Sequence, residues 1–264
     1  LAAYTGANGT DGPAITSDFY QSWVSAYGQT DPANADPRFY KKNVTIDPNT
    51  DEACVDPATY RLDRGILRGQ QYGLKLSSGR FVTCGTGKYV VAKLYNANKA
   101  RPTVPVIHTE LVDYSPAGSD YSTGYRVLKY EFSQKSVSGR NFGDVDFPIV
   151  RLADVYMMRA EAKLRKGDAA GALADVNTVR NARTANIPSS SLNSITLDIL
   201  FRERGFEFYW EYQRRTDMVR FGKFEGAWTE KTSTDKNKRV FPIPQKAIDG
   251  SSNIPGYLKQ NDGY

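Results

Sequence analysis

The sequence predicts a mainly α fold with a minor α+β component. A helical hairpin and a long third helix are expected to follow an irregular, loop-rich half that carries short strands. Two observations lead to this prediction. Clusters of Gly, Pro, Asn and Asp recur through the first half and break it into short segments. From residue 147 onward, apolar residues instead recur at helical spacing. We therefore divide the chain into residues 1–146 and residues 147–264.

The first portion is expected to hold one helix and a few short strands. Residues 17–27 predict a helix, because their aromatic and aliphatic side chains recur at helical spacing. Val, Tyr and Phe favour strands because they pack well on a pleated surface. Three segments rich in such residues are therefore expected to be strands: 80–95, 104–112 and 124–132.

A helical hairpin is predicted over residues 147–183. Gly167 suits the left-handed end of its first helix, and Asp168 suits the N-cap of its second. The first helix is expected to bury one broad face: Leu152, Val155, Tyr156, Ala160 and Leu164. The stripe expected for the second helix is Ala172, Leu173, Val176 and Val179.

A third, long helix is predicted over residues 197–215, with Thr196 as its N-cap. The hairpin before it partly matches the tetratricopeptide pattern through Ala160, Ala172 and Val179. The sequence holds no second copy of this pattern. Because one such unit cannot bury both of its faces, we expect the hairpin to stack on a part of the chain that this sequence does not include, or on another protein.

The order of motifs resembles the C-terminal half of the SusD/RagB family of outer-membrane glycan-binding lipoproteins. Four segments carry the likeness: DPRF at 36–39, residues 124–130, the hairpin at 147–183, and residues 195–224. VFPIPQKAI and LKQNDGY close the match, which is strongest from residue 147 to the end. Family members are longer and begin with helical repeats and a lipidated Cys. We therefore expect this sequence to be the C-terminal portion of such a protein, or a reduced member that lacks the N-terminal half of the fold.

The resemblance implies a binding protein and not an enzyme. It implies capture of oligosaccharide or polysaccharide at the extracellular face of the outer membrane, and delivery to a SusC-like TonB-dependent transporter for nutrient uptake. Membrane association would come from a lipid anchor that this sequence does not contain, and no cofactor is implied. The alternative is a helical-repeat scaffold that binds a protein and no sugar. A glycoside hydrolase is a third class.

Aromatic rings beside polar loops are the candidate sugar contacts, because a flat apolar face with a polar tip suits sugar stacking. The chain has 17 Tyr. The candidates are Trp23, Tyr95, Tyr114, Tyr121 and Trp228. Trp23 also fits the buried face of its own helix. The other four lie in segments rich in turn-forming residues. Three of these four belong to the first portion, which is therefore the expected ligand-facing part.

Glu203 and Glu207 lie four residues apart on one predicted helix face. A pair of carboxylates can perform acid–base hydrolysis. The simpler interpretation is an internal ion-pair network with arginines such as Arg151 and Arg159. Residues 210–224, WEYQRRTDMVRFGKF, are interpreted as an internal latch, in which Arg215 and Arg220 pair with acids of neighbouring helices.

Several other chemistries find little support in the sequence. His108 is the single histidine and lies in an apolar run, and no GxSxG motif occurs. DPNTDE, at 47–52, lacks the central Gly and the distal Glu of a calcium loop, so no metal site is assigned. The 35 Lys and Arg residues are interleaved with 29 acids, which argues against a nucleic-acid surface. Cys54 and Cys84 could form a disulfide or remain two thiols.

Overall fold

The computed structural model describes residues 14–41, 46–47, 49–56, 58, 63–95, 103–114, 123–130, 146–184, 187–251, 254 and 256–264. Its internal contacts divide the chain into two compact units. Unit 1 comprises Leu1–Trp210 and unit 2 comprises Glu211–Tyr264. Within the described ranges, none of the helices has the length and the apolar character needed to cross a membrane.

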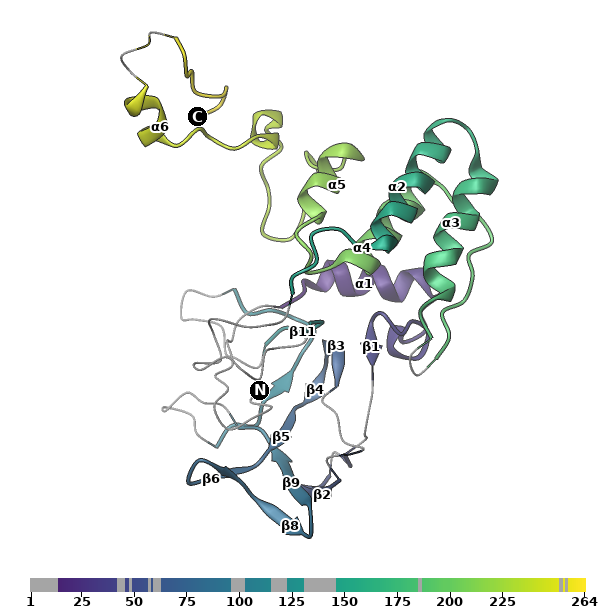
Figure 1. Cartoon of the computed structure of the whole chain (residues 1–264), viewed down its shortest axis with the longest axis vertical. Helices are drawn as coiled ribbons and strands as arrows, with labels where there is room; N and C mark the ends of the chain where they lie inside the picture. The colour runs from purple at the N-terminus through teal and green to yellow at the C-terminus, as the bar shows by residue number, and fades with distance from the viewer. Residues whose placement is uncertain are drawn as a thin grey trace. The chain divides into compact units, whose positions relative to one another are not determined.

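Four α-helices gather on one side of unit 1, and its strands lie on the other (Figure 1). The helices are α1 (Ser17–Ala26), α2 (Leu152–Arg165), α3 (Ala169–Asn181) and α4 (Leu197–Phe208). Side-chain caps begin three of them, since Thr16, Asp168 and Thr196 accept hydrogen bonds from first-turn amides. A 3₁₀ turn, η1 (Pro32–Asn34), follows α1.

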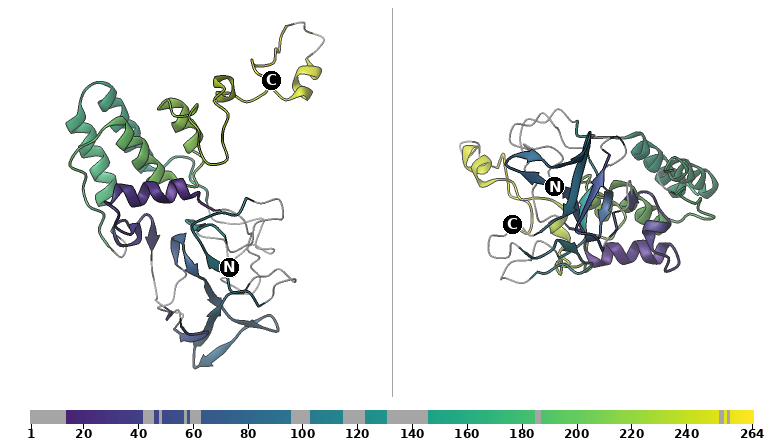
Figure 2. Two further views of the ribbon diagram at one scale, coloured as in Figure 1. Left: turned by 180° about the vertical axis from the view of Figure 1, so that it is seen from behind. Right: turned by 90° about the horizontal axis from the view of Figure 1, so that it is seen from below.

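The predicted hairpin of α2 and α3 is present, and the two helices lie side by side in both views of Figure 2. Gly167 has φ +86° and ends α2, as predicted, because a left-handed residue costs Gly little. The buried stripe of α3 is also confirmed at Ala172, Val176 and Val179.

The predicted apolar face of α2 was wrong in part. The helix buries Ala153, Met157 and Ala160, whereas Leu152 is 71% exposed and Val155 is about half exposed. Small alanines permit a close approach of α2 to its neighbours α3 and α4, and this contact selects the buried face. The larger side chains of the other face are left outside.

The predicted long third helix was also wrong, because α4 ends at Phe208. Trp210 and Tyr212 adopt left-handed φ values of +63° and +60°. Lys129 donates to the carbonyls of Glu207 (2.7 Å) and Tyr209 (3.1 Å) at this helix end. These bonds satisfy carbonyls that have no partner inside the helix, so tertiary contacts fix the end of α4.

The strands of unit 1 form small antiparallel sheets. One joins β1 (Tyr40–Lys41), β3 (Arg64–Leu67) and β11 (Arg126–Leu128). A second joins β2 (Glu52–Val55), β9 (Lys88–Lys93) and β5 (Tyr72–Leu74), and β8 (Thr83–Gly85) also pairs with β9. Two-stranded pairs unite β4 (Gly69–Gln70) with β10 (Ile107–His108), and β6 (Leu76–Ser77) with β7 (Arg80–Phe81). The predicted strand at 80–95 is thus three strands joined by turns.

One hydrophobic core joins residues from both sides of the composition change at residue 147. It contains Ile15, Trp23, Phe39 and Ile66 from the first portion, together with Phe206 and Tyr209 from the second. Trp23 stacks on Phe206 with ring centroids 3.8 Å apart. The change in composition therefore marks a change from strands to helices within unit 1, and not a boundary between two cores.

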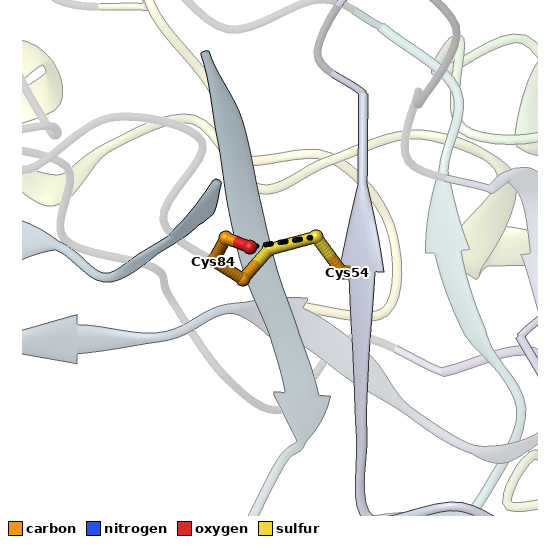
Figure 3. Close-up of a disulfide and its surroundings, with 2 residues drawn as sticks. All are labelled: Cys54 and Cys84. Atoms are coloured by element: carbon orange, nitrogen blue, oxygen red, sulfur yellow. Dashed lines mark hydrogen bonds between the residues drawn. A yellow bond between two sulfur atoms is a disulfide. The ribbon is translucent and has the colours of Figure 1, made fainter. Parts of the chain in front are cut away.

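Cys54 of β2 and Cys84 of β8 form a disulfide (Figure 3). The structure thereby selects the first of the two alternatives left open by the sequence. The bond closes a loop of 30 residues. By loop-closure entropy such a bond stabilises the folded state by about 3–4 kcal/mol. It fastens a part of the chain in which the described residues bury few apolar side chains.

Unit 2 contains α5 (Arg214–Arg220), the 3₁₀ turn η2 (Lys236–Arg239) and α6 (Gln245–Gly250). Phe224 is its one buried apolar side chain among the described residues. A tight turn links Trp228 and Lys231 through reciprocal backbone hydrogen bonds. Unit 2 is thus held together mostly by polar contacts and turns.

Candidate functional site

The structure excludes one of the five candidate sugar contacts. The side chain of Trp23 is fully buried, between Phe206 on one face and the edge of Phe39. A ring without exposed surface cannot stack on a sugar, so the prediction for Trp23 was wrong. Its helical spacing indicated the core position correctly.

Two candidates present exposed rings in unit 1. Tyr95 is 47% exposed and forms an isolated bridge with Pro105. Tyr114 is 49% exposed and follows a segment that is anchored by the hydrogen bond from the Asp113 amide to Thr123 Oγ1 (3.1 Å). Both rings therefore extend from backbone that is held in place. Tyr121 lies outside the described residues.

Trp228 belongs to unit 2. Its indole nitrogen donates to the Lys223 carbonyl at 3.0 Å, and the side chain is 37% exposed. One edge of the ring is thus fixed while part of its face remains open. Trp228 and the two tyrosines belong to different units, so each ring is described within its own unit.

Glu203 lies at the centre of a buried ion-pair network. Its carboxylate accepts from Arg38 at 2.9 Å and from Arg180 at 2.7 Å, and all three side chains are almost completely buried. Arg38 also binds Asp36 at 2.6 Å. Asp36 in turn accepts a hydrogen bond from the Tyr27 hydroxyl at 2.5 Å. Buried charges persist in proteins when they are paired in this way.

Glu207 joins the same network one turn later. It pairs with Arg151 at 2.9 Å and with Arg183, and Arg38 lies 3.9 Å away. Burial acts to raise the pKa of Glu207, but the hydrogen bond from Arg183 and the surrounding guanidinium charges outweigh it and hold this pKa below its ordinary value. Glu207 therefore stays ionised near neutral pH and holds no proton to donate as a general acid.

Arg159 lies elsewhere than expected. It pairs with Asp175 at 2.6 Å and so ties α2 to α3, with Lys163 on the other oxygen at 2.9 Å. The members of the network that the sequence did not indicate are Asp36, Arg38, Arg180 and Arg183. A signal existed for the first two, since DPRF places an acid and an arginine together in a turn.

Residues 210–224 make internal contacts, but the partners of Arg215 differ from those that the latch interpretation expected. Arg215 donates to the carbonyls of Lys238 and Arg239, and its guanidinium lies over the rings of Phe224 and Phe241. Arg220 pairs with Asp217 of its own helix at 2.7 Å. Both arginines thus make these contacts inside unit 2, and the expected pairing of Arg215 with acids of neighbouring helices was wrong.

Comparison with known proteins gives a consistent result. A family model described as the SusD family matches residues 2–264. The starch-binding protein SusD of Bacteroides thetaiotaomicron is 35% identical over 159 residues, which cover 55% of this chain and 27% of SusD. The chain therefore matches less than a third of the length of this curated relative.

Solved structures of similar proteins are also found. A SusD-like protein from Bacteroides fragilis is 26% identical, with 57% of this chain and 32% of that chain covered and a TM-score of 0.43. A laminarin-binding SusD-like protein is 27% identical, with 57% and 30% covered and a TM-score of 0.39.

Proposed function

Because the chain belongs to the SusD family, we propose that it binds oligosaccharide or polysaccharide without cleaving it. The observation that carries this proposal is the 35% identity to a starch-binding protein over 159 residues. A second observation supports the absence of cleavage. Glu203 and Glu207, the paired carboxylates that the sequence offered for acid–base chemistry, both form ion pairs with arginines.

The proposed function extends to uptake. The captured glycan would be delivered at the extracellular face of the outer membrane to a TonB-dependent transporter, as the family resemblance implies. Co-purification tests this step. The tagged full-length protein should elute from detergent-solubilised outer membranes of its host together with one β-barrel transporter in a fixed ratio. Elution without any such transporter would contradict the delivery step alone.

Binding is tested by calorimetry against a panel that includes starch and laminarin. We expect one polysaccharide of the panel to bind, and the mixture to gain no new reducing ends during prolonged incubation. Reducing ends that accumulate with the wild-type protein would indicate a hydrolase. Absence of binding across a broad glycan array would contradict the proposed function.

The contacts that we propose for the glycan are Tyr95, Tyr114, Tyr121 and Trp228. An aromatic contact contributes about 0.5–1.5 kcal/mol beyond its buried area, so each Tyr→Ala or Trp→Ala change should weaken binding severalfold. Trp23→Ala is not informative here, because it removes a core side chain. A residue whose replacement leaves the affinity within twofold is not a contact.

The alternative function is protein–protein contact, and one observation favours it. Six apolar side chains are exposed on α2 and on the segment before it: Phe147, Ile149, Val150, Leu152, Val155 and Met158. Exposed apolar surface of this kind is typical of contact surfaces when it is contiguous. The occupant that fits is a helix with an apolar stripe, since helical hairpins stack on one another through such faces. No glycan binding together with a defined complex in light scattering would favour this alternative.

A further inference from the structure

Two tyrosines from distant parts of unit 1 meet on its surface. Tyr20 of α1 and Tyr125, which precedes β11, pack edge to face with ring centroids 5.0 Å apart. Both rings are partly buried against the core, and Tyr20 also contacts Phe39 at 5.9 Å. Yet no group in the described part of the chain makes a hydrogen bond with either phenol hydroxyl. The rings are thus positioned by packing, while their polar tips remain available.

A partly exposed ion pair lies beside these rings. Arg68 donates to both carboxylate oxygens of Asp31, at 2.9 and 3.0 Å. Its guanidinium lies 5.2 Å from the centre of the Phe39 ring, which also contacts Tyr20. The Arg68 and Asp31 side chains remain 25% and 41% exposed. This bidentate pair therefore holds a fixed orientation and still reaches solvent.

A second carboxylate is positioned from α1. Glu110 accepts hydrogen bonds from Ser17 Oγ (2.5 Å) and Gln21 Nε2 (2.7 Å) through the same oxygen, Oε1. Its other oxygen has no hydrogen-bond partner among the residues that the structure describes. Four residues later the chain reaches the exposed ring of Tyr114.

These groups are close enough to act on one phenol. Burial raises the pKa of Tyr125, and the neighbouring Tyr20 raises it further. Arg68 acts to lower this pKa, whereas the carboxylates of Glu110 and Asp31 act to raise it. The net shift is upward, so the Tyr125 hydroxyl keeps its proton at neutral pH and can both donate and accept a hydrogen bond.

This combination matches the chemistry of a neutral sugar. A pyranose offers a C–H face that packs on aromatic rings, and vicinal hydroxyls that bridge the two ends of an arginine–carboxylate pair. An anionic ligand fits poorly, because one guanidinium stands beside two carboxylates. A nonpolar ligand would leave those charges and hydroxyls without partners, which is costly.

We propose that this surface is a binding subsite for a neutral sugar unit, formed by Tyr20, Tyr125, Arg68, Asp31 and Glu110. The proposal rests on the proposed function, since it names a place on unit 1 where the glycan binds. The side chains are held by a helix, a sheet and the core before any ligand arrives. Such a preorganised surface loses little conformational entropy on binding.

The test uses the whole chain and the polysaccharide of the panel that binds wild-type protein, with calorimetry as the measurement. Tyr20→Phe and Tyr125→Phe remove only the hydroxyls. Because those hydroxyls have no hydrogen-bond partner among the residues that the structure describes, both variants should keep the wild-type melting temperature. We expect each to weaken binding about 3- to 10-fold, as for the loss of one hydrogen bond. Arg68→Gln should weaken binding about tenfold or more, because it removes a charged donor.

The matched control is Glu52→Gln, which removes one member of an exposed ion pair, Lys75 with Glu52, on another part of unit 1. It should bind as wild type does. An acidic polysaccharide such as polygalacturonate should bind at least tenfold more weakly than a neutral one.

Wild-type affinity in both Tyr→Phe variants and in Arg68→Gln would overturn this subsite and leave the proposed function intact. Failure of the wild-type protein to bind any glycan would overturn both. Preference for polygalacturonate would overturn the assignment to a neutral sugar. Gln21→Ala is a further variant that affects only the support of Glu110, and it should reduce affinity less than Arg68→Gln does.

Discussion

Glu203 is buried with two arginines, and these three residues come from three separate segments. Arg38 follows η1, Arg180 lies near the end of α3, and Glu203 itself lies on α4. An isolated buried carboxylate would be strongly unfavourable, but two guanidinium groups within 3 Å offset its lost hydration. The residue thus links the turn after α1 to the helical hairpin, and its contribution depends on both partners being present.

Replacement of Glu203 should therefore be costly. Glu203→Ala leaves two buried guanidinium groups without their shared carboxylate, and we expect the free energy of unfolding to fall by about 3–5 kcal/mol. Urea denaturation followed by circular dichroism measures this change. Glu52→Ala, at an ion pair with both partners largely exposed, should change it by less than about 1 kcal/mol. Equal effects of the two variants would contradict a special role for the buried network.

The network should also make the protein sensitive to acid. The pKa values of Glu207 and Asp36 are lowered in the folded protein, by partners that outweigh the opposing effect of burial. A carboxylate with a lowered folded pKa stabilises the protein above its unfolded pKa, about 4. That stabilisation is lost as the pH falls through the folded pKa.

We therefore expect wild-type stability to be nearly level from pH 7 to about 5, and to decline below about pH 4. Glu207→Gln should lower the stability at pH 7 and lessen the decline, because one of the linked protons is gone. Denaturation curves at a series of pH values measure both effects. A variant whose pH profile is as steep as that of wild type would argue that Glu207 is not a source of the decline.

Replacement of Arg215 tests whether its contacts stabilise unit 2. Arg215→Ala removes donors to the carbonyls of Lys238 and Arg239 and a cation over two aromatic rings. We expect a loss of about 1–3 kcal/mol in the stability of unit 2, with glycan affinity per folded molecule nearly unchanged. Arg215→Lys should recover only part of the loss, since an ammonium lacks the planar fork. Normal stability with lost binding would instead assign this stretch to the ligand site.

At the scale of elements, α2 has two faces of opposite character. Met157 is completely buried, whereas Leu152 faces solvent. Met157→Ala should lower the free energy of unfolding by about 2–5 kcal/mol, because it leaves a cavity. Leu152→Ala should change it by less than about 0.5 kcal/mol. Both variants replace a large apolar side chain of α2 by Ala, and they differ in the face of the helix that they change. Thermal denaturation of both variants therefore checks the orientation of α2. A large loss for Leu152→Ala would show that its face is covered.

The ends of most helices could be predicted from the sequence because local chemistry determines them. Asp168 and Thr196 cap through their own side chains, and Gly167 ends α2 through its own backbone freedom. The end of α4 could not be predicted, since aromatic residues continue past Phe208 at compatible spacing. It depends on Lys129, and on the Tyr209 hydroxyl, which donates to the Arg38 carbonyl (2.9 Å). These partners lie far away in the sequence.

The same distinction applies to the candidate site. Exposed Tyr95 and Tyr114 could be chosen from the polar loops around them. The grouping of Tyr20 with Tyr125, and of Arg68 with Asp31, was not predicted, because each pair joins segments that only the folded chain brings together. Sequence patterns can indicate which side chains are exposed. They are less able to indicate which exposed side chains contact one another in the folded chain.

At the scale of the whole molecule, the two units differ in how much apolar surface they bury. Unit 1 holds nearly all the buried apolar side chains that the structure describes, whereas Phe224 is the one buried apolar side chain in the described part of unit 2. Large side chains of unit 2 remain exposed: Tyr212, Val240, Phe241, Ile254, Tyr257 and Tyr264. Regions with few buried apolar contacts open at a lower free energy than the core does.

Hydrogen–deuterium exchange of the whole chain should therefore reveal a graded stability. We expect amides of residues 226–264 to exchange within seconds to minutes, and those of α4 to require the opening of the main core. Peptides covering α5 should be intermediate, because its turns are hydrogen-bonded and Arg215 holds it to later segments. Arg215→Ala should speed exchange in α5 and leave α4 unchanged. Equal protection of residues 226–264 and α4 would mean that contacts beyond those within unit 2 stabilise the C-terminal segment, and its exposed rings would then be the first residues to examine as that interface.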